Sequence, residues 1–229
     1  MKLYEIYKGL EEVTLIYEHE GKKHKFITTE AERVEMPHKD LLKKAINFRK
    51  KLSDKEFLKN TCGFKEVDFE DLVISFKDKN KKLNHPMISL PAGVSCPGAG
   101  NCLSFYNPED GKLYVATENK GSMCYSAAME AGNSAGGTKG AAGFRKQIYN
   151  NFYVIENTLK KGYNALGDMI TKSIQHHELE YGPMSELRIH EDGDFYSEDY
   201  FKAWVKTAVL NPSTHFYFYT KSLPYLVKF

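Results

Sequence analysis

Three of the four cysteines are placed where thiol chemistry is expected. Cys96 and Cys102 share a loop rich in glycine and proline, and Cys124 follows further along the chain. Thiolates are soft ligands that favour zinc or an iron–sulfur cluster over harder cations. The clustering therefore predicts a cysteine-ligated metal centre. Three unrelated buried cysteines are the plainer alternative.

The number of thiols bears on the kind of centre. Three thiolates leave one position of a four-iron cluster open, as a catalytic cluster requires, because a fully ligated cluster cannot hold substrate on iron. A structural zinc site needs a fourth protein ligand, which Cys62 or His85 could supply. Both kinds of centre remain open from the residues alone.

A second group of polar residues follows an apolar stretch at 186–190. Glu191, Asp192 and Asp194 form an acidic loop around Gly193. Carboxylates in such a loop suit an ammonium group or a divalent cation, and a lead into the next helix is the plainer interpretation. Lys221 ends a later stretch and could bind a carboxylate or phosphate, pair with Asp194, or lie in solvent.

The elements that must position these residues alternate between strand and helix. Strands are expected at 87–90, 186–190 and 216–219, and helices at 144–174 with a break near 162 and at 197–211, where Ser197 caps the start. This order implies parallel strands with right-handed crossovers. The carboxyl ends of such strands meet at one edge, where the cysteines and acids would gather. Three strands do not close a barrel, so the expected fold is α/β, a partial parallel (β/α) barrel, and truncation of a longer protein is favoured over an open sheet.

The first part of the chain has a different pattern. A hairpin is expected over 12–29, a helix over 38–58 and a short helical stretch over 69–76, before a polar run at 78–84. We therefore divide the chain into an amino-terminal α+β cap, residues 1–84, and the partial barrel with its cysteine-bearing loop, residues 85–229.

Composition sets the surroundings. The formal net charge of the 229 residues is +2, and the basic runs are interleaved with acids, so solvated surfaces are the better interpretation, with nucleic acid still a possible partner. The chain has no signal-peptide pattern and no stretch of about 20 apolar residues, which a membrane span needs. A cytoplasmic location follows, where thiols stay reduced.

Two further motifs are weak. The glycine-rich run 132–140 lacks the Gly-Lys-Ser/Thr order of a phosphate loop, so a lid over the cysteines or a plain linker is expected. His190 ends a predicted strand, and a lone histidine there is more often a hydrogen-bonded core residue than a ligand.

Several blocks together resemble a known family. They are ISLPAG at 88–93 with Cys96 and Cys102, MCYSA at 123–127, LRIHEDGDFYS at 187–197 and FYTKSLP at 218–224. The sequence from about 87 onward resembles the phage-encoded gene-product-88 domain family and related radical-SAM-like phage proteins. The usual compact Cys-x3-Cys-x2-Cys triplet is absent.

The resemblance implies a radical-SAM-type barrel that holds a [4Fe-4S] cluster with S-adenosylmethionine on its unique iron. Cys96, Cys102 and Cys124 match the cluster ligands, and Tyr125 matches the aromatic residue beside the adenine. The acidic loop matches the turn that holds the methionyl amino group, with Asp194 the first choice and Asp192 the second. Ser197 and Lys221 complete the predicted cofactor-binding set.

The implied function is reductive cleavage of S-adenosylmethionine and hydrogen abstraction from an unknown substrate, in the host cytoplasm. Two alternatives stay open. One is a zinc-stabilised phage protein that binds nucleic acid without catalysis. The other is a Mg- or Mn-dependent hydrolase that uses the loop from Glu191 to Asp194.

Overall fold

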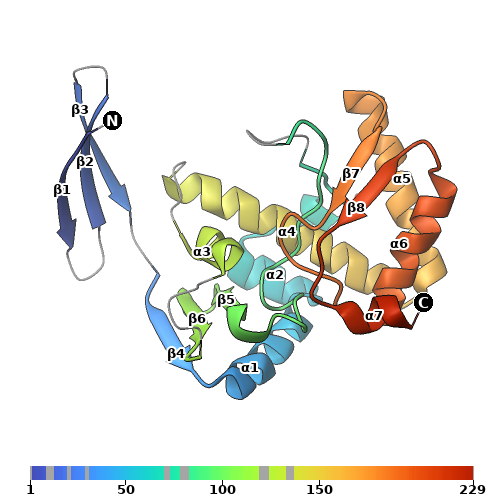
Figure 1. Ribbon diagram of the computed structural model, residues 1–229, viewed down its shortest axis with the longest axis horizontal. Helices are drawn as coiled ribbons and strands as arrows, with labels where there is room; N and C mark the ends of the chain where they lie inside the picture. Colours follow the sequence, from blue (N-terminus) through green and yellow to red (C-terminus); the bar gives the residue numbers. More distant parts are fainter. Residues whose placement is uncertain are drawn as a thin grey trace.

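Three small β-sheets and a set of helices make up the described part of the chain in a computed structural model (Figure 1). The structure describes residues 2–8, 13–19, 22–28, 31–69, 73–77, 83–118, 124–132 and 137–228. The strands are β1 (Lys2–Lys8), β2 (Val13–His19), β3 (Lys22–Thr28), β4 (Arg33–Met36), β5 (Ser104–Asn107), β6 (Lys112–Ala116), β7 (Glu186–Ile189) and β8 (His215–Phe218). The helices are α1 (His38–Lys51), α2 (Lys55–Cys62), α3 (Tyr125–Ala131), α4 (Gly137–Leu159), α5 (Tyr163–Tyr181), α6 (Glu198–Leu210) and α7 (Leu223–Val227). None of these helices is long and apolar enough to cross a membrane.

The first sheet confirms the predicted hairpin and adds a strand to it. Strands β2 and β3 pair antiparallel from Val13 opposite Thr28 to His19 opposite Lys22. Strand β1, which the sequence did not predict, pairs antiparallel with β2. Residues 20–21, which connect the two strands of the predicted hairpin, lie outside the described residues.

The second sheet joins distant parts of the sequence. Strand β4 runs parallel to β6, and β5 runs antiparallel to β6, so the strand order is β4-β6-β5. The core also spans the sequence, because Leu41 and Phe48 of α1 share one apolar cluster with Phe152 of α4 and Trp204 of α6. Residues on both sides of position 84 therefore build one core.

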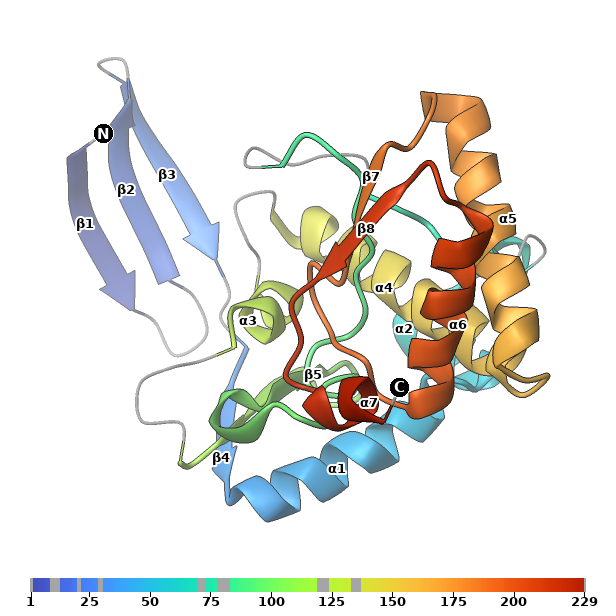
Figure 2. The same cartoon turned by 45° about the vertical axis from the view of Figure 1, so that its right-hand side comes forward.

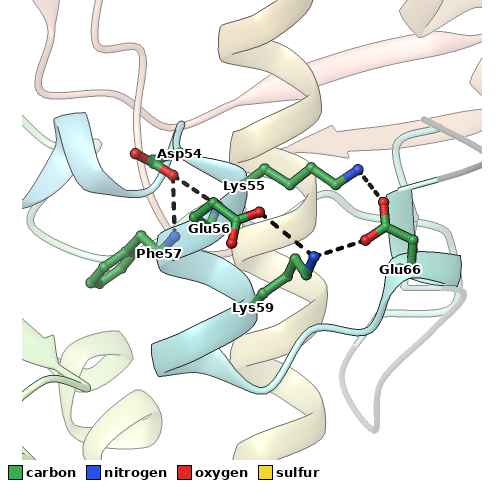
Figure 3. A network of polar contacts seen from close by, with 6 residues as sticks. All are labelled: Asp54, Lys55, Glu56, Phe57, Lys59 and Glu66. Carbon is green, nitrogen blue, oxygen red and sulfur yellow. Dashed lines mark hydrogen bonds and ion pairs between the residues drawn. The ribbon is translucent and has the colours of Figure 1, made fainter.

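The helix expected over 38–58 is divided into two. The Asp54 side chain accepts hydrogen bonds from the backbone N–H groups of Glu56 (2.8 Å) and Phe57 (3.1 Å), which starts α2 as a separate helix. Glu66, which follows α2 in the sequence, forms ion pairs with Lys55 and Lys59 of this helix (Figure 3). Hydrogen bonds from these two lysines lower the pKa of Glu66 to about 2.

The prediction of a helical stretch over 69–76 was wrong for the residues of this range that the structure describes. A short 3₁₀ helix covers Glu66–Phe69, residues 73–76 are not helical, and 70–72 lie outside the described residues. The backbone N–H of Ile74 donates to Ser173 Oγ (3.1 Å), and that of Ser75 donates to Asn151 Oδ1 (2.8 Å). Side chains of α5 and α4 therefore satisfy the donors that a helix would have used.

The third sheet confirms the predicted strand–helix–strand unit. Strands β7 and β8 are parallel, from Glu186 opposite His215 to Ile189 opposite Phe218, and α6 connects them. Ser197 Oγ accepts from the Tyr200 N–H (3.2 Å) and caps α6, as expected. Helices α4 and α5 confirm the helical region and its break, where Gly162 has φ +98°.

The segment at 87–90 is extended beside β7 but is too irregular to count as a strand. The Ile88 N–H donates to the Arg188 carbonyl (3.1 Å), and the Arg188 N–H donates to the Pro86 carbonyl (3.1 Å). It therefore runs parallel to β7, and Figure 2 shows it passing alongside. Within the described ranges β7 and β8 are the one parallel pair of the third sheet, and a partial barrel of radical-SAM type stays a prediction.

Candidate thiol and carboxylate site

The loop that carries Cys96 and Cys102 is tightly wound. The Ser95 hydroxyl donates to the Pro91 carbonyl (2.6 Å), and the backbone N–H groups of Ala99 and Cys102 donate to carbonyls three residues earlier (3.1 Å each). Cys96 and Cys102 therefore lie within one compact series of turns. The sequence is rich in glycine here because the backbone has to turn and approach its neighbours closely.

Two glycines let this loop lie against the loops that follow β7 and β8. A Cβ atom on Gly98 would lie 2.6 Å from the Lys221 carbonyl oxygen, and one on Gly193 would lie 2.7 Å from both Leu90 Cβ and Ser95 Oγ. Gly193 also has φ +87°, a conformation that other residues rarely adopt. The three loops are therefore in direct backbone contact.

Cys124 reaches the same place from another element. It precedes α3, and two side chains of α3 anchor this helix to the other loops. The Ser126 hydroxyl donates to Asp192 Oδ1, and the buried Glu130 carboxylate accepts from the Ala92 N–H (2.6 Å). Burial raises the pKa of Glu130 well above its usual range. Sequence reasoning missed Glu130, whose only signal is an acid among the small residues of this helix.

A cavity of about 320 Å³ lies between these loops. The predicted residues that line it are Cys96, Cys102, Cys124, Asp192, Asp194 and Lys221. They come from the loop after the extended segment, the start of α3, and the loops after β7 and β8. The structure thus brings together six of the eight predicted site residues, at the edge where the carboxyl ends of parallel strands meet.

The thiols differ in their surroundings. Burial raises the pKa of Cys96 and Cys124, so both are neutral thiols at pH 7 in the absence of a metal. The Lys221 ammonium donates to Cys102 Sγ at 2.7 Å, and this hydrogen bond raises the pKa of Lys221. Lys221 therefore places its positive charge on the thiol side of the cavity.

The buried Asp194 carboxylate holds two loops together. Its Oδ1 accepts from the Phe195 N–H (2.7 Å) and the Thr220 hydroxyl (2.5 Å), and its Oδ2 accepts from the Lys221 N–H (2.9 Å). The pairing between Lys221 and Asp194 considered from sequence is thus made by the backbone of Lys221. Since three protein donors already use this carboxylate, it serves to fix the loop after β8.

The other two acids of the loop have different partners. Asp192 accepts from Ser126 and is buried, and this burial raises its pKa. Glu191 forms an ion pair with Lys77 at 2.9 Å. Of the three acids, Asp192 therefore has the carboxylate best placed to meet a ligand in the cavity.

Two predicted cofactor-binding residues lie outside the set that lines the cavity. Tyr125 is 74% exposed on the first turn of α3, and the Ser197 hydroxyl is used in capping α6. The two candidates for a fourth ligand also lie elsewhere. Cys62 packs against the core, where burial raises its pKa to about 12, and His85 Nε2 is hydrogen-bonded to the Tyr217 hydroxyl at 3.0 Å.

His190 is buried, as expected for a core histidine. Its Nε2 is hydrogen-bonded to the Tyr200 hydroxyl at 2.9 Å. The φ of His190 is +66°, which is unusual for a residue other than glycine. Burial lowers its pKa to about 3, so the ring is neutral. In the glycine-rich run 132–140, residues 133–136 lie outside the described residues, and the backbone from 137 onward belongs to α4.

The three thiols share a cavity without forming a ready-made metal site. Across the described ranges, no three His, Cys, Asp or Glu side chains are close enough together to hold a metal ion. The donor chemistry nevertheless fits a thiophilic metal, because three soft ligands from separate elements line one cavity. Binding a metal there requires the thiols to lose their protons and draw together.

Comparison with protein-family models shows which family the chain resembles. A family model described as Gene product 88 matches residues 22–229. No curated protein and no solved structure matches the chain.

Proposed function

This chain belongs to the Gene product 88 family of phage gene products, and we propose that its cavity is a cysteine-ligated centre of iron–sulfur type that binds S-adenosylmethionine. One observation carries the proposal. Cys96, Cys102 and Cys124 come from separate stretches of the chain and line a single cavity. Three soft donors at the carboxyl edge of parallel strands favour a thiophilic centre over a magnesium or calcium site.

The cavity supports a role beyond structural zinc. Structural zinc sites are closed by four protein ligands, and Cys62 and His85 both lie outside the lining residues. A centre held by three thiolates keeps a position for a small molecule. The volume of about 320 Å³ is near the lower limit of ordinary small-molecule sites, which is about 300 Å³.

The residues of the chain have distinct roles in this proposal. When bound, a reduced cluster supplies the electron for cleavage of S-adenosylmethionine, which leads to hydrogen abstraction from a substrate. Asp192 binds the amino group of the methionyl moiety. The positive charge of this ammonium group offsets the cost of burying the Asp192 carboxylate. Asp194 holds the loop after β8 in place. Lys221 compensates negative charge on the thiolate of Cys102.

The assignment of the amino group to Asp192 changes the order expected from sequence, where Asp194 was the first choice. The reason is the number of protein donors, since Asp194 accepts three hydrogen bonds and Asp192 accepts one from Ser126. The same contacts weigh against a Mg- or Mn-dependent hydrolase. The Asp194 carboxylate already accepts hydrogen bonds from three protein donors, and the Glu191 carboxylate forms an ion pair with Lys77.

Anaerobic purification followed by metal and sulfide analysis tests the proposal. The protein is expected to bind iron and acid-labile sulfide with visible charge-transfer absorption. Cys96→Ala, Cys102→Ala and Cys124→Ala should each abolish this absorption, and Cys62→Ala is the matched control that should retain it.

Each alternative has its own outcome in this experiment. If the protein is colourless and binds one zinc per chain through the same cysteines, the centre is a zinc site and not an iron–sulfur cluster. Activity with Mg or Mn that survives loss of the cysteines would favour the hydrolase. In equilibrium dialysis with S-adenosylmethionine, Asp192→Asn is expected to lose binding while it keeps its iron.

A further inference from the structure

We propose that the open face of the β7–β8 sheet binds single-stranded nucleic acid, whose bases stack on the tyrosine and histidine rings of β8 and on the ring of Tyr219, the residue that follows it. This ligand is a candidate substrate class for the proposed function. Binding of the strand does not depend on that function, whereas any reaction of the bound strand at the cysteine site does. It starts from the residues that this sheet leaves uncovered beside the cavity.

Alternation along the two strands separates a core face from an open face. Leu187 and Ile189 are buried, and Phe216 and Phe218 pack against the aromatic side chains of α6 and its preceding loop. The residues between them point to the opposite face. On that face lie Glu186, Arg188, His215, Tyr217 and Tyr219, with Glu186 opposite His215 and Arg188 opposite Tyr217.

The open face carries a row of rings. The rings of His215 and Tyr217 are stacked with centroids 6.3 Å apart, and those of Tyr217 and Tyr219 meet edge to face at 6.2 Å. The His85 ring contacts Tyr217 from the neighbouring extended segment at 5.4 Å. Tyr219 is 73% exposed, and the His215 side chain is 75% exposed. These rings therefore offer faces to a planar ligand.

Charges of both signs accompany the rings. The Glu186 carboxylate lies 3.6 Å from His215 Nδ1 and 4.0 Å from His85 Nε2. Arg188 supplies a positive charge. The Arg188 guanidinium lies over the Tyr219 ring, 5.5 Å from its centroid, and within the described part of the chain it forms no ion pair. Its Nε is buried and lacks a hydrogen-bond partner among the described groups. An arginine that is stacked on a tyrosine and has no carboxylate partner is suited to bind a phosphate while a base stacks nearby.

The row leads directly to the cavity. Tyr219 lines the cavity, and the chain continues from it through Thr220 to Lys221, which contacts Cys102. A base stacked on Tyr219 would thus stand at the entrance to the cysteine site. Sheets that present aromatic residues on one face are a recurring platform for unpaired bases.

The chemistry favours a single strand over a duplex. Stacking requires exposed base faces, which a duplex keeps within its own stack. The open face combines aromatic rings with a guanidinium, the two kinds of group on which unpaired bases stack. The ligand is therefore expected to bind through stacking and through few phosphate contacts.

Fluorescence anisotropy with the full chain and a labelled oligothymidylate of about 12 nucleotides, a length within the usual range for such sites, tests this inference. Tyr219→Ala is expected to weaken binding by roughly 5- to 150-fold, the range measured for loss of one stacking contact. Arg188→Gln should weaken binding and lower the dependence on salt by roughly one phosphate contact.

Tyr163→Ala is the matched control for the tyrosine variant. Tyr163 is a partly exposed tyrosine on α5 with Lys202 near its ring at 6.0 Å, but it has no neighbouring row of rings within the described residues. Its replacement should leave oligonucleotide binding unchanged. Equal losses in Tyr163→Ala and Tyr219→Ala would overturn the inference, as would a wild-type protein that does not bind the oligonucleotide.

Two competitors and one cysteine variant complete the test. A duplex of the same length, or thymidine monophosphate, that displaces the oligonucleotide with equal affinity would also refute a single-strand platform. Cys102→Ala should lose metal and keep oligonucleotide binding, so that failure of the metal proposal and failure of this inference give different results. Tyr219→Ala should keep its melting temperature, which shows that the variant is folded.

Discussion

Replacing Gly98 by alanine is expected to separate the cysteine-bearing loop from the loop after β8. The new Cβ atom would lie 2.6 Å from the Lys221 carbonyl oxygen and 2.9 Å from the Lys221 carbonyl carbon. Both are backbone atoms, so no side-chain rotation can relieve the clash. The backbones of the two loops must move apart, which changes the surroundings of the Lys221 and Cys102 side chains that meet between them.

The size of the effect follows from two opposing contributions. Overpacking of a close contact costs about 1 to 3 kcal/mol. Alanine also stiffens the unfolded chain, which stabilises the protein by about 0.4 to 1 kcal/mol where the native backbone conformation tolerates it. The free energy of unfolding should therefore fall by up to about 2.6 kcal/mol, with a central value of about 1 kcal/mol, and the melting temperature by about 2 to 4 °C for each kcal/mol.

Gly143→Ala in α4 is the matched control. A Cβ atom at this position would meet nothing within 4 Å, so alanine should stabilise the helix by about 0.5 to 1 kcal/mol. Thermal and urea unfolding of both variants, with thiol labelling by a chromogenic disulfide, form the assay. If Gly98→Ala is as stable as Gly143→Ala and its cysteines react no faster than those of the wild type, the described packing of the loops is incorrect.

Three further predictions concern single residues. Ser197→Ala should lower the free energy of unfolding by about 1 kcal/mol through loss of the α6 cap, and it should leave metal content unchanged if the hydroxyl has no cofactor role. The buried His190 has a pKa of about 3 in the folded protein against about 6.5 when unfolded, so the stability it confers is present above pH 6.5 and is lost as the pH falls toward 3. Urea unfolding should therefore show a loss of about 2 kcal/mol from pH 8 to pH 5 that is absent in His190→Asn, since asparagine tolerates the positive φ. Burial raises the pKa of Cys62 to about 12, so this thiol should react with thiol reagents more slowly than Cys102. Mass spectrometry of labelled peptides measures the order, and the prediction is wrong if Cys62 is labelled first.

The unit from β7 through α6 to β8 could be predicted because its signals are local. Alternating apolar residues mark the strands, and Ser197 marks the start of the helix. The meeting of Cys96 and Cys102 with the acidic loop was predicted from a general rule, that the carboxyl ends of parallel strands lie at one edge. Cys124 reaches the cavity from the start of α3, which that rule does not predict.

The remaining features depend on contacts between distant residues. Pairing of β4 with β6 leaves no trace in the pattern of either strand, and it links the expected amino-terminal unit to the rest. The segment 73–76 is not helical because Ser173 and Asn151 satisfy its N–H groups. The direction of the Lys221 ammonium toward Cys102 likewise depends on the backbone hydrogen bond to Asp194, which no local pattern specifies.

The contacts of Asp194 and Lys221 together constrain the charge of the site. Because the carboxylate of Asp194 binds the backbone, the Lys221 ammonium is free to act on the thiols. One ammonium does not compensate three thiolates, and burial accordingly raises the pKa of Cys96 and Cys124 so that both stay protonated. Loss of these protons requires the added positive charge of a metal, so metal uptake should release protons and weaken as the pH falls. Two thiols that stay protonated until a metal enters favour a thiolate centre and give no such reason for a carboxylate-based hydrolase.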